Sequence, residues 1–276
     1  MRAEKGMNPN MGKLIRKHDA YAKEWFEKFF GGLYGRVLAR QIATARTLRQ
    51  ARLIKKLLGL RKGRSVLDCP CGQGRLTIPL AKMGLAMTGV DLTAGFIRRA
   101  KAAARRLPGR QRKMLRFIRR DMRRIDFDGE FDAVINWFSS FGYFAERENL
   151  AFCRRMLKAL KPGGQFLIEV MNKSYMLRHL HSGYEQTING VRIANKPKWD
   201  ARASRVRDTW TMSRGSRTEI RKLSLRVYTG GEMRELLRSA GFTDIRLWGH
   251  SRKGAQRMTR HARRFIAVGR RPEKGD

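Results

Sequence analysis

The residues with the clearest chemical potential lie between Ser65 and Arg75, a segment that predicts a strand, a tight glycine-bearing turn and the start of a helix. Gly72 and Gly74 lack a Cβ, so the backbone amides of this turn can approach a ligand closely. The helix N-terminus behind them favours a carboxylate or a phosphate. Turns of this kind also occur for packing alone, so the loop indicates a ligand site without fixing the ligand.

Three acidic residues sharpen this interpretation. Asp68 ends the first predicted strand, Asp91 ends the second and Asp121 follows the third. In a doubly wound sheet all three reach the carboxyl edge, where ligands bind. Asp91 can accept hydrogen bonds from both hydroxyls of a ribose. Asp121 can accept one from the exocyclic amine of an adenine, while Met122 offers backbone and an apolar surface to the ring.

The position of Asp68 discriminates between two classes of adenosine ligand. A dinucleotide would place a diphosphate beside the loop, where the carboxylate of Asp68 would repel it. The ammonium and sulfonium groups of S-adenosylmethionine would be attracted instead. The residues therefore favour S-adenosylmethionine as the cofactor.

Five segments stand in the order and at the spacing typical of class I methyltransferases, and the chain resembles that family closely over about residues 60–170. The helix, strand and final hairpin after Thr229 also resemble the family's seven-stranded sheet. One position departs from the pattern, because Pro70 replaces the first glycine of the loop and fixes φ at about −65°. The five segments are Val66-Leu-Asp-Cys-Pro-Cys-Gly-Gln-Gly-Arg75, Thr88-Gly-Val-Asp-Leu92, Arg120-Asp-Met122, Phe131-Asp-Ala-Val-Ile135 and Leu160-Lys-Pro-Gly-Gly164.

This resemblance implies an S-adenosylmethionine-dependent methyltransferase and assigns its cofactor contacts. The implied residues are Asp68, Gly72 and Gly74 around the methionine moiety, Asn136 near the methyl end, Asp91 and Leu92 at the ribose and adenine, and Asp121 and Met122 at the adenine edge.

An aromatic segment follows the fourth predicted strand. Residues 136–144 hold five aromatic side chains in nine positions, and they resemble the corresponding part of small-molecule-type methyltransferases of the domain 25/11-like kind. Residues 25–34 resemble the N-terminal aromatic lid of the same branch. A substrate pocket needs apolar walls with a few polar groups. We expect Phe138 and Phe141 to pack in the core, and we regard Trp137 and Tyr143 as substrate candidates, with core packing as the alternative for both.

No catalytic residue can be assigned. Methyl transfer needs a nucleophile aligned with the sulfonium, and positioning alone can lower the barrier by ~7–11 kcal/mol, so a dedicated base is optional. His179 and His181 follow the fifth predicted strand, but we expect both at the surface. The segment after the fourth strand also lacks the Asn/Asp-Pro-Pro-aromatic turn of enzymes that methylate amino groups of nucleic acids, which argues against such an acceptor.

Short apolar runs alternate with helical stretches from Ser65 onward, which predicts βα units and a parallel sheet. A further helix begins after Thr229, which can cap it, and ends before Gly241. The other helices are expected near Arg75 to Met83, Ala94 to Arg106 and Glu148 to Leu160. The strands are expected at Ser65 to Asp68, Ala86 to Asp91, Leu115 to Arg119, Phe131 to Asn136, Gln165 to Val170, Asp244 to Gly249 and Arg264 to Val268.

The predicted fold is α/β, with a doubly wound, mostly parallel seven-stranded sheet of the Rossmann-like kind, an antiparallel β insertion and N-terminal helices. Residues 20–60 show helical periodicity and predict two or three helices. Residues 184–228 are rich in Thr, Val, Ile and Trp, with turn signals at Asn189-Gly190 and at 213–216. The expected parts are a basic tail (1–17), a helical lid (18–60), the cofactor-binding core (61–172), the insertion (173–228) and the C-terminal part of the core (229–276).

The charge is unusual, because 62 Lys and Arg against 23 Asp and Glu give a net charge of +39. Such a field attracts nucleic acid non-specifically. Residues 98–120 hold eleven Lys or Arg and no acid, and residues 173–228 hold thirteen against four. Since the excess runs along the whole chain, a general arginine bias and selection for an anionic partner both stay open.

The remaining composition points to a soluble, cytoplasmic protein without a metal. The apolar runs are far shorter than the ~20 residues that cross a membrane. The N-terminus lacks the apolar core of a secretory signal. Cys69, Cys71 and Cys153 lack the spacing of a disulfide framework or a zinc site.

Three functions fit these observations. The leading one is methyl transfer to a small-molecule acceptor by direct displacement. The second uses the same cofactor site to methylate RNA or another polyanion. The third keeps the fold without turnover, as a nucleic-acid-binding or interaction module.

Overall fold

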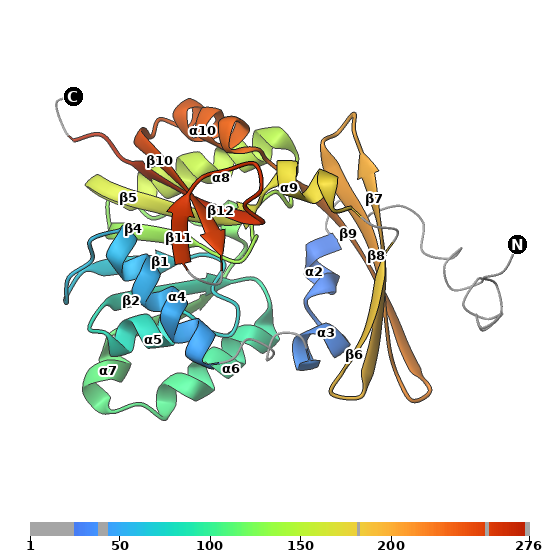
Figure 1. The fold of residues 1–276 in the computed structure, drawn as a ribbon. Coiled ribbons are helices and arrows are strands. Elements are labelled where there is room, and N and C mark those ends of the chain that lie inside the picture. Colours follow the sequence, from blue (N-terminus) through green and yellow to red (C-terminus); the bar gives the residue numbers. More distant parts are fainter. Residues whose placement is uncertain (1–24, 38–43, 181–182, 252–253, 274–276) are drawn as a thin grey trace, which may run out of the picture.

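The computed structural model describes residues 25–37, 44–180, 183–251 and 254–273 (Figure 1). The predicted basic tail and His181 lie outside these ranges. Within them, no helix combines the length and the apolar character needed to cross a bilayer.

The main sheet has eight strands in the described chain, in the order β11-β10-β12-β5-β4-β1-β2-β3. Strands β3, β2, β1, β4 and β5 run parallel, whereas β12 and β10 continue the sheet antiparallel. This arrangement confirms the predicted doubly wound α/β fold, to which the short edge strand β11 adds an eighth member. The bounds are β1 Ser65–Asp68, β2 Ala86–Asp91, β3 Leu115–Arg119, β4 Phe131–Asn136, β5 Leu160–Met171, β10 Thr243–Ser251, β11 Gly254–Arg257 and β12 Arg264–Arg270.

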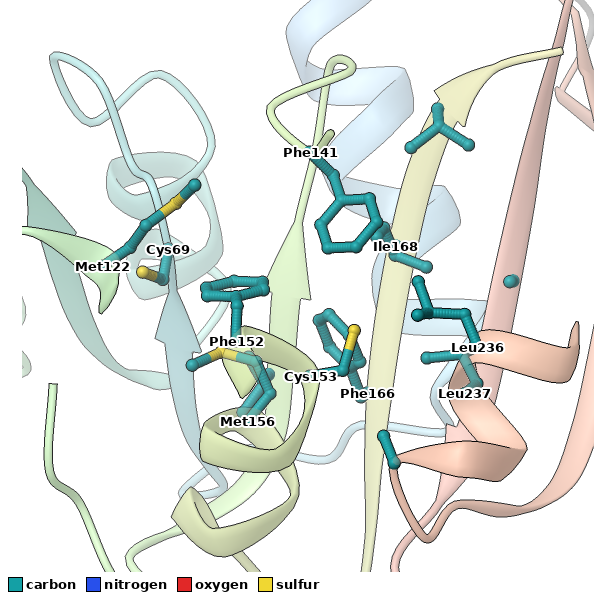
Figure 2. Packing of buried hydrophobic residues seen from close by; sticks show 14 of the residues in the cluster. Cys69, Met122, Phe141, Phe152, Cys153, Met156, Phe166, Ile168, Leu236 and Leu237 are labelled. Carbon is teal, nitrogen blue, oxygen red and sulfur yellow. The ribbon is translucent and has the colours of Figure 1, made fainter. Parts of the chain in front are cut away.

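Helices cover both faces of this sheet because alternate strand residues point to opposite sides. In β1, Val66 packs with α4 and α5, whereas Leu67 packs in the cluster that contains α8 and α10. Figure 2 shows that second cluster, where Phe152 and Met156 of α8 lie beside Phe166 of β5. The helix bounds are α4 Thr44–Leu57, α5 Thr77–Lys82, α6 Ala94–Arg105, α7 Gly109–Lys113, the 3-10 turn η2 Met122–Arg124, α8 Glu146–Ala159 and α10 Gly230–Ser239.

The cap of α10 agrees with its prediction. Thr229 Oγ1 accepts a hydrogen bond from Glu232 N at 3.1 Å, and Glu232 Oε2 accepts one from Thr229 N at 2.7 Å. This reciprocal pair satisfies two free N–H groups at the helix start. Gly241 follows the helix with φ of 99°, a conformation that glycine adopts without a Cβ penalty.

The predicted insertion is a separate antiparallel sheet of four strands, preceded by the short helix α9 (Lys173–Arg178), which the sequence prediction did not include. Its first turn falls at Asn189 and Gly190, with φ of 49° and 73°, as expected for the two central residues of a type I′ hairpin turn. The strands are β6 Tyr184–Ile188, β7 Val191–Asp200, β8 Arg205–Arg214 and β9 Arg217–Arg226.

The N-terminal helices have two different positions. Helix α4 packs on the main sheet through Ala51 and Ile54. Helices α2 (Trp25–Phe29) and α3 (Gly32–Val37) lie between the main sheet and the insertion (Figure 1). The lid predicted over residues 18–60 is therefore divided: within the described residues only α2 and α3 lie over the sheet's mouth, and α4 belongs to the core.

Candidate active site

A cavity lies at the carboxyl ends of β1, β2 and β4 and extends under α2 and α3. It encloses about 1120 Å³ of empty space, its open mouth included. The lining residues are Phe26, Phe30, Tyr34, Asp68, Pro70, Cys71, Gly72, Gln73, Arg75, Leu76, Asp91, Leu92, Thr93, Phe96, Arg120, Asp121, Met122, Trp137, Phe138, Ser140, Tyr143 and Phe144.

Asp68 lies at the base of this cavity as a nearly isolated carboxylate. It is 2% exposed, and its Oδ2 accepts a hydrogen bond from Thr77 Oγ1 at 2.6 Å. Among the described residues no cationic side chain lies within ion-pair distance of it. Burial raises the pKa of Asp68 to about 7, against the opposing effect of the Thr77 hydroxyl. A cationic ligand group would stabilise its ionised form.

Asp91 organises the glycine loop. Its Oδ2 accepts a hydrogen bond from Gly72 N at 2.9 Å, and its Oδ1 accepts one from Thr93 N at 2.7 Å. Burial raises the pKa of Asp91, while these bonds act in the opposite direction. Each carboxylate oxygen keeps a further lone pair for a ligand hydroxyl.

The two loop glycines have different surroundings. Gly72 has φ of 57°, lines the cavity, and a Cβ added there would meet nothing within 4 Å. Gly74 has φ of 79° and does not line the cavity, and a Cβ there would lie 3.1 Å from the ring of Phe117. Close packing therefore explains Gly74, whereas Gly72 faces the space that a ligand would fill.

Asp121 and Met122 both line the cavity as predicted, but Asp121 already holds a partner. Arg123 Nη2 and Nε lie 2.7 and 3.0 Å from Asp121 Oδ2, and Arg123 N donates to Oδ1 at 2.8 Å. The Arg123 guanidinium also lies over the rings of Phe26 and Phe144, at 5.2 and 4.9 Å. Asp121 thus positions an arginine that joins this end of the cavity to the lid.

Asn136 lies behind the wall of the cavity and does not line it. Its Nδ2 donates to the carbonyl oxygens of Cys69 and Ser140 at 2.9 and 3.2 Å. The side chain is fully buried, and its Oδ1 has no hydrogen-bond partner among the described residues. Asn136 therefore connects the glycine loop to the segment after β4, and its predicted contact with the methyl end of the donor stays a prediction.

The lid supplies the apolar side of the cavity. Phe26, Phe30 and Tyr34 line it, and the Trp25 and Tyr143 rings meet at 5.0 Å. Burial raises the pKa of Tyr34 to about 12. Two contacts fix the lid: Leu33 N donates to Glu219 Oε2 at 3.0 Å, and Arg99 Nη1 donates to Gly35 O at 2.7 Å.

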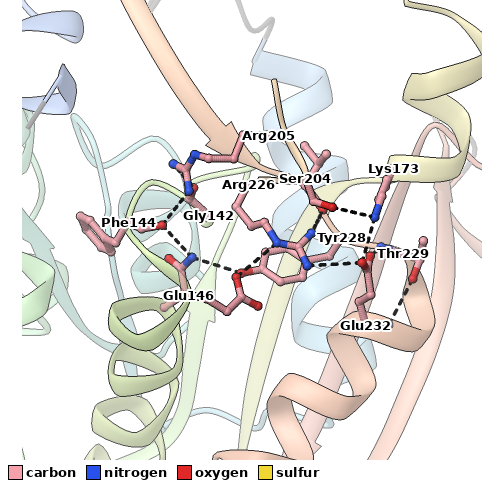
Figure 3. Close-up of polar contacts among 12 residues, drawn as sticks. Gly142, Phe144, Glu146, Lys173, Ser204, Arg205, Arg226, Tyr228, Thr229 and Glu232 are labelled. Atoms are coloured by element: carbon pink, nitrogen blue, oxygen red, sulfur yellow. Dashed lines mark hydrogen bonds and ion pairs between the residues drawn. The ribbon is translucent and has the colours of Figure 1, made fainter. Parts of the chain in front are cut away.

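The segment after β4 is held in place by the insertion (Figure 3). Arg205 of β8 donates to the carbonyl oxygens of Phe144, Tyr143 and Gly142 at 2.8, 3.0 and 3.2 Å. Nearby, Tyr228 Oη donates to Glu146 Oε2 at 3.1 Å. The β insertion therefore contributes to the site by supporting a wall segment.

The aromatic residues of this segment have different surroundings. Trp137 and Tyr143 line the cavity and are also buried in the core, with 3% and 9% exposed, so their role toward a substrate stays a prediction. Phe141 is 2% exposed in the core, as expected. Phe138 was expected in the core, but it lines the cavity and is 38% exposed. The reason is its backbone, because Phe138 and Ser139 adopt φ of 68° and 56°, which turns the Phe138 side chain outward.

A buried polar cluster holds this unusual turn. Glu169 Oε2 accepts a hydrogen bond from Phe138 N at 2.9 Å, and Glu169 O accepts one from Ser139 N at 3.0 Å. Arg264 donates to Ser139 Oγ at 2.8 Å and to Glu169, and His250 Nδ1 lies 3.0 Å from Glu169 Oε1. Arg264 and His250 keep the pKa of Glu169 below its usual range despite full burial. His250 thus has a structural partner, and His179 is exposed, as predicted.

Sequence reasoning missed several lining residues, of which Arg75 and Phe138 matter most. Arg75 stood at the end of the glycine loop motif, and this position next to the predicted site was the available signal. Its partners, Thr47 and Gln50, come from α4. No local pattern links these residues.

Comparisons with known proteins agree with this geometry. Residues 66–164 match the family described as Methyltransferase domain. The protein YqeM of Bacillus subtilis (strain 168) is 34% identical over 111 residues, which are 40% of this chain and 42% of YqeM. The chain spans about half the length, or less, of the curated relatives that it matches first.

Solved structures share the fold over most of the chain. The CcbJ methyltransferase from Streptomyces caelestis superposes with a TM-score of 0.75 at 18% identity, covering 91% of this chain and all of CcbJ. The aminopentose methyltransferase CalS10 from Micromonospora echinaspora superposes with a TM-score of 0.62 at 20% identity, covering 89% and 99%. Residues 66–164 therefore match a methyltransferase domain, and the solved methyltransferase structures share the fold of the chain.

Proposed function

We propose that this protein transfers a methyl group from S-adenosylmethionine to a small-molecule acceptor by direct displacement. The observation that carries the proposal is a single cavity that joins the buried carboxylates after β1 and β2 to an aromatic lid. The family match supports the donor, and CalS10 was solved with S-adenosylmethionine bound.

The residues present fit the cofactor. Asp68 is a buried carboxylate without a cationic partner in the described chain, which suits the donor's ammonium group. Asp91 is fixed by two backbone amides and retains acceptor capacity for ribose hydroxyls. Leu92 and Met122 offer apolar surface to an adenine. When bound, S-adenosylmethionine supplies an electrophilic methyl group on its sulfonium.

The lid and the segment after β4 would receive the acceptor. Their rings form an apolar enclosure that excludes water and holds a nucleophile in line, and such positioning lowers a barrier without a base. Tyr34 and Tyr143 have pKa values raised by burial, so their hydroxyls stay protonated at neutral pH and can donate hydrogen bonds but cannot accept protons. No histidine is found among the described residues that line the cavity.

The enclosure favours a small acceptor over RNA. Helices α2 and α3 cover the cavity, and their contacts with Glu219 and Arg99 keep them in place. A nucleotide of RNA would have to be extruded from its strand and passed beneath this lid. A free metabolite needs only to enter the mouth.

The decisive experiment measures transfer of a labelled methyl group from S-adenosylmethionine to a metabolite extract and, separately, to total RNA at physiological salt. We expect label in the metabolite fraction, and its loss with Asp91→Ala. An exposed substitution far from the cavity, Arg238→Gln, serves as the matched control that keeps full transfer. Label in RNA alone would reject the small-molecule acceptor, and no donor binding at all would reject the methyltransferase.

A further inference from the structure

The turn after β4 holds an aromatic ring in a backbone conformation that such a residue adopts only under constraint. Phe138 and Ser139 follow each other with φ of 68° and 56°, in the left-handed region. Residues other than glycine that adopt this region are mostly Asn and Asp, whose short polar side chains bond locally. Among the described non-glycine residues with positive φ, Phe138 is the only aromatic one. Strained backbone of this kind concentrates at functional sites and persists only where neighbouring groups hold it.

The groups that hold this turn come from β5, β10 and β12, and they are charged or titratable and buried. Glu169 is 1% exposed, and it accepts the N–H of Phe138 with Oε2 and the N–H of Ser139 with its backbone oxygen. Arg264 Nη1 lies 3.0 Å from the same Oε2 and donates to Ser139 Oγ. His250 Nδ1 lies 3.0 Å from the other carboxylate oxygen. A buried ion pair contributes little net stability, because desolvation offsets the attraction. We therefore attribute to this cluster the shape of the turn.

The consequence is a ring that projects into the cavity without an aromatic partner. Phe138 is 38% exposed, more than any other aromatic residue that lines the cavity. The ring of Tyr143, by contrast, contacts those of Phe26, Phe30 and Phe144 at 5.9–6.3 Å. No such ring contact is found for Phe138 in the described part of the chain. Its exposed surface is therefore open to a ligand, and apolar walls of this kind are typical of small-molecule sites.

The charges beside the ring indicate which part of a ligand it would contact. The guanidinium groups of Arg264 and Arg75 lie over the Phe138 ring, at 4.7 and 5.6 Å from its centre, and help to hold it. Glu169 pairs with Arg264, and the charges of Asp68 and Glu169 stabilise that of Arg75. These cations are thus already compensated within the protein. The ring therefore suits an apolar, uncharged part of a ligand better than a charged one.

We propose that Phe138 is a specificity-determining residue of the acceptor site, whose ring packs on an apolar, uncharged part of the acceptor, and that Glu169 is a positioning residue that acts through the turn at Phe138 and Ser139. The inference rests on the proposed function and deepens it, because it names the chemistry of the part of the acceptor that is bound here. Glu169 does not line the cavity, so its effect on the acceptor has to pass through the turn.

The test uses the metabolite fraction that the wild-type protein methylates, isolated by transfer of the labelled methyl group. Dilution of this fraction at saturating S-adenosylmethionine gives an apparent KM and a kcat, and titration calorimetry gives the donor affinity. We expect Phe138→Ala to raise the apparent KM by about tenfold, the scale of one buried aromatic contact. Its kcat and its donor affinity should stay unchanged, because the lost contact binds the acceptor in its ground state. Leu177→Ala removes an exposed apolar side chain outside the cavity lining and should change none of these values.

A double-mutant cycle tests the positioning role. Glu169→Gln keeps the size of the side chain but removes the charge that pairs with Arg264. It should raise the apparent KM when Phe138 is present and have no further effect in Phe138→Ala, because a positioning residue acts only through the ring that it holds. Effects of the two substitutions that multiply would overturn this role and leave Glu169 with a merely structural one.

A second pair of variants keeps the test valid if Glu169→Gln fails to fold. Phe138→Gly and Phe138→Ala both remove the ring, but only glycine adopts the φ of 68° without a Cβ penalty. Phe138→Gly should therefore have the higher Tm, whereas in relaxed backbone glycine is the less stable of the two. A lower Tm would show that the turn is not strained.

Two outcomes of the kinetic test would overturn the acceptor assignment. One is an unchanged apparent KM in both Phe138 variants, and the other is a loss of donor affinity in place of the rise in KM. If the wild-type protein labels no metabolite, the proposed function itself fails, and this assignment fails with it.

Discussion

The two walls of the cavity differ in chemistry and in construction. One wall, called the donor wall because we propose that it binds the methyl donor, carries Asp68 and Asp91, which end adjacent parallel strands. Short hydrogen bonds to Thr77, Gly72 and Thr93 fix these two carboxylates. The opposite wall is aromatic and comes from the lid and from residues 137–144. Charge recognition is thus confined to one side of the cavity, and shape and apolar contact dominate the other.

This difference indicates how the two substrates are distinguished. A ligand with an ammonium, a ribose and an adenine finds complementary groups along the donor wall. An acceptor against the aromatic wall contributes mainly buried apolar area, worth roughly 25 cal/mol per Å². Variants on the two walls should therefore separate donor affinity from acceptor affinity.

The largest effect is expected from Asp91→Ala on the donor wall. It removes the proposed acceptor for both ribose hydroxyls. It also releases Gly72 N and Thr93 N, so the loop loses two of the hydrogen bonds that hold its shape. A hydrogen bond to a charged group contributes about 1.5–3 kcal/mol, which corresponds to a loss of tenfold or more in donor affinity. Asp91→Asn retains one oxygen and should lose less. Calorimetry on folded variants with wild-type affinity would remove Asp91 from the site.

A pH effect of up to about tenfold per unit should follow from Asp68. Its pKa is raised to about 7, so below that pH the free protein carries a proton that must leave before an ammonium binds. The affinity of the wild-type protein for the donor should fall as the pH decreases from 8 to 5. The Asp68→Asn variant should bind the donor more weakly, with an affinity that changes little over this pH range. A wild-type profile that is already flat would contradict the role.

The same raised pKa makes a stability prediction with a defined sign. Folding disfavours the ionised carboxyl, so Asp68 costs stability increasingly from its unfolded pKa of about 3.9 up to about 7, and the full cost applies above that. Without donor, Asp68→Asn should therefore raise Tm more at pH 8 than at pH 5. Equal changes in Tm at both pH values would show that the carboxyl titrates normally in the folded protein.

The donor wall could be predicted from sequence because its determinants are local. Strands β1 to β4 match their predicted bounds to the residue, and the acids at their ends follow from the turn signals. The aromatic wall was predicted less well. The position of Phe138 depends on contacts with Glu169 and Arg264, which lie 31 and 126 residues away in the sequence. No periodic pattern in the sequence indicates contacts between such distant residues.

A smaller effect is expected from the lid. Phe30→Ala removes a ring that contacts Trp25, Tyr34 and Tyr143, but it removes no charge-assisted bond to the donor. Donor affinity should change by less than about threefold. Donor should slow amide exchange in residues 25–37 and 173–228 of the wild-type protein, because ligands order such closing segments. A tenfold loss of donor affinity in Phe30→Ala would show that the two walls are not separate.

The smallest effect on the cavity is expected from the basic outer surface. Arg98, Lys101 and Arg105 on α6 are exposed and belong to the run of residues 98–120 without an acid. Reversing their charges should leave donor affinity unchanged and weaken RNA binding.

We propose that this RNA binding is non-specific. A plot of the logarithm of the affinity against the logarithm of the salt concentration should have a slope of about −0.7 per single-strand phosphate contacted, without sequence preference. Because such attraction needs only net charge, the bound RNA should accept no methyl group. The prediction would be wrong if one preferred RNA stayed bound at physiological salt and accepted a methyl group, and if Asp91→Ala abolished this transfer. RNA held by this surface would then be the methyl acceptor.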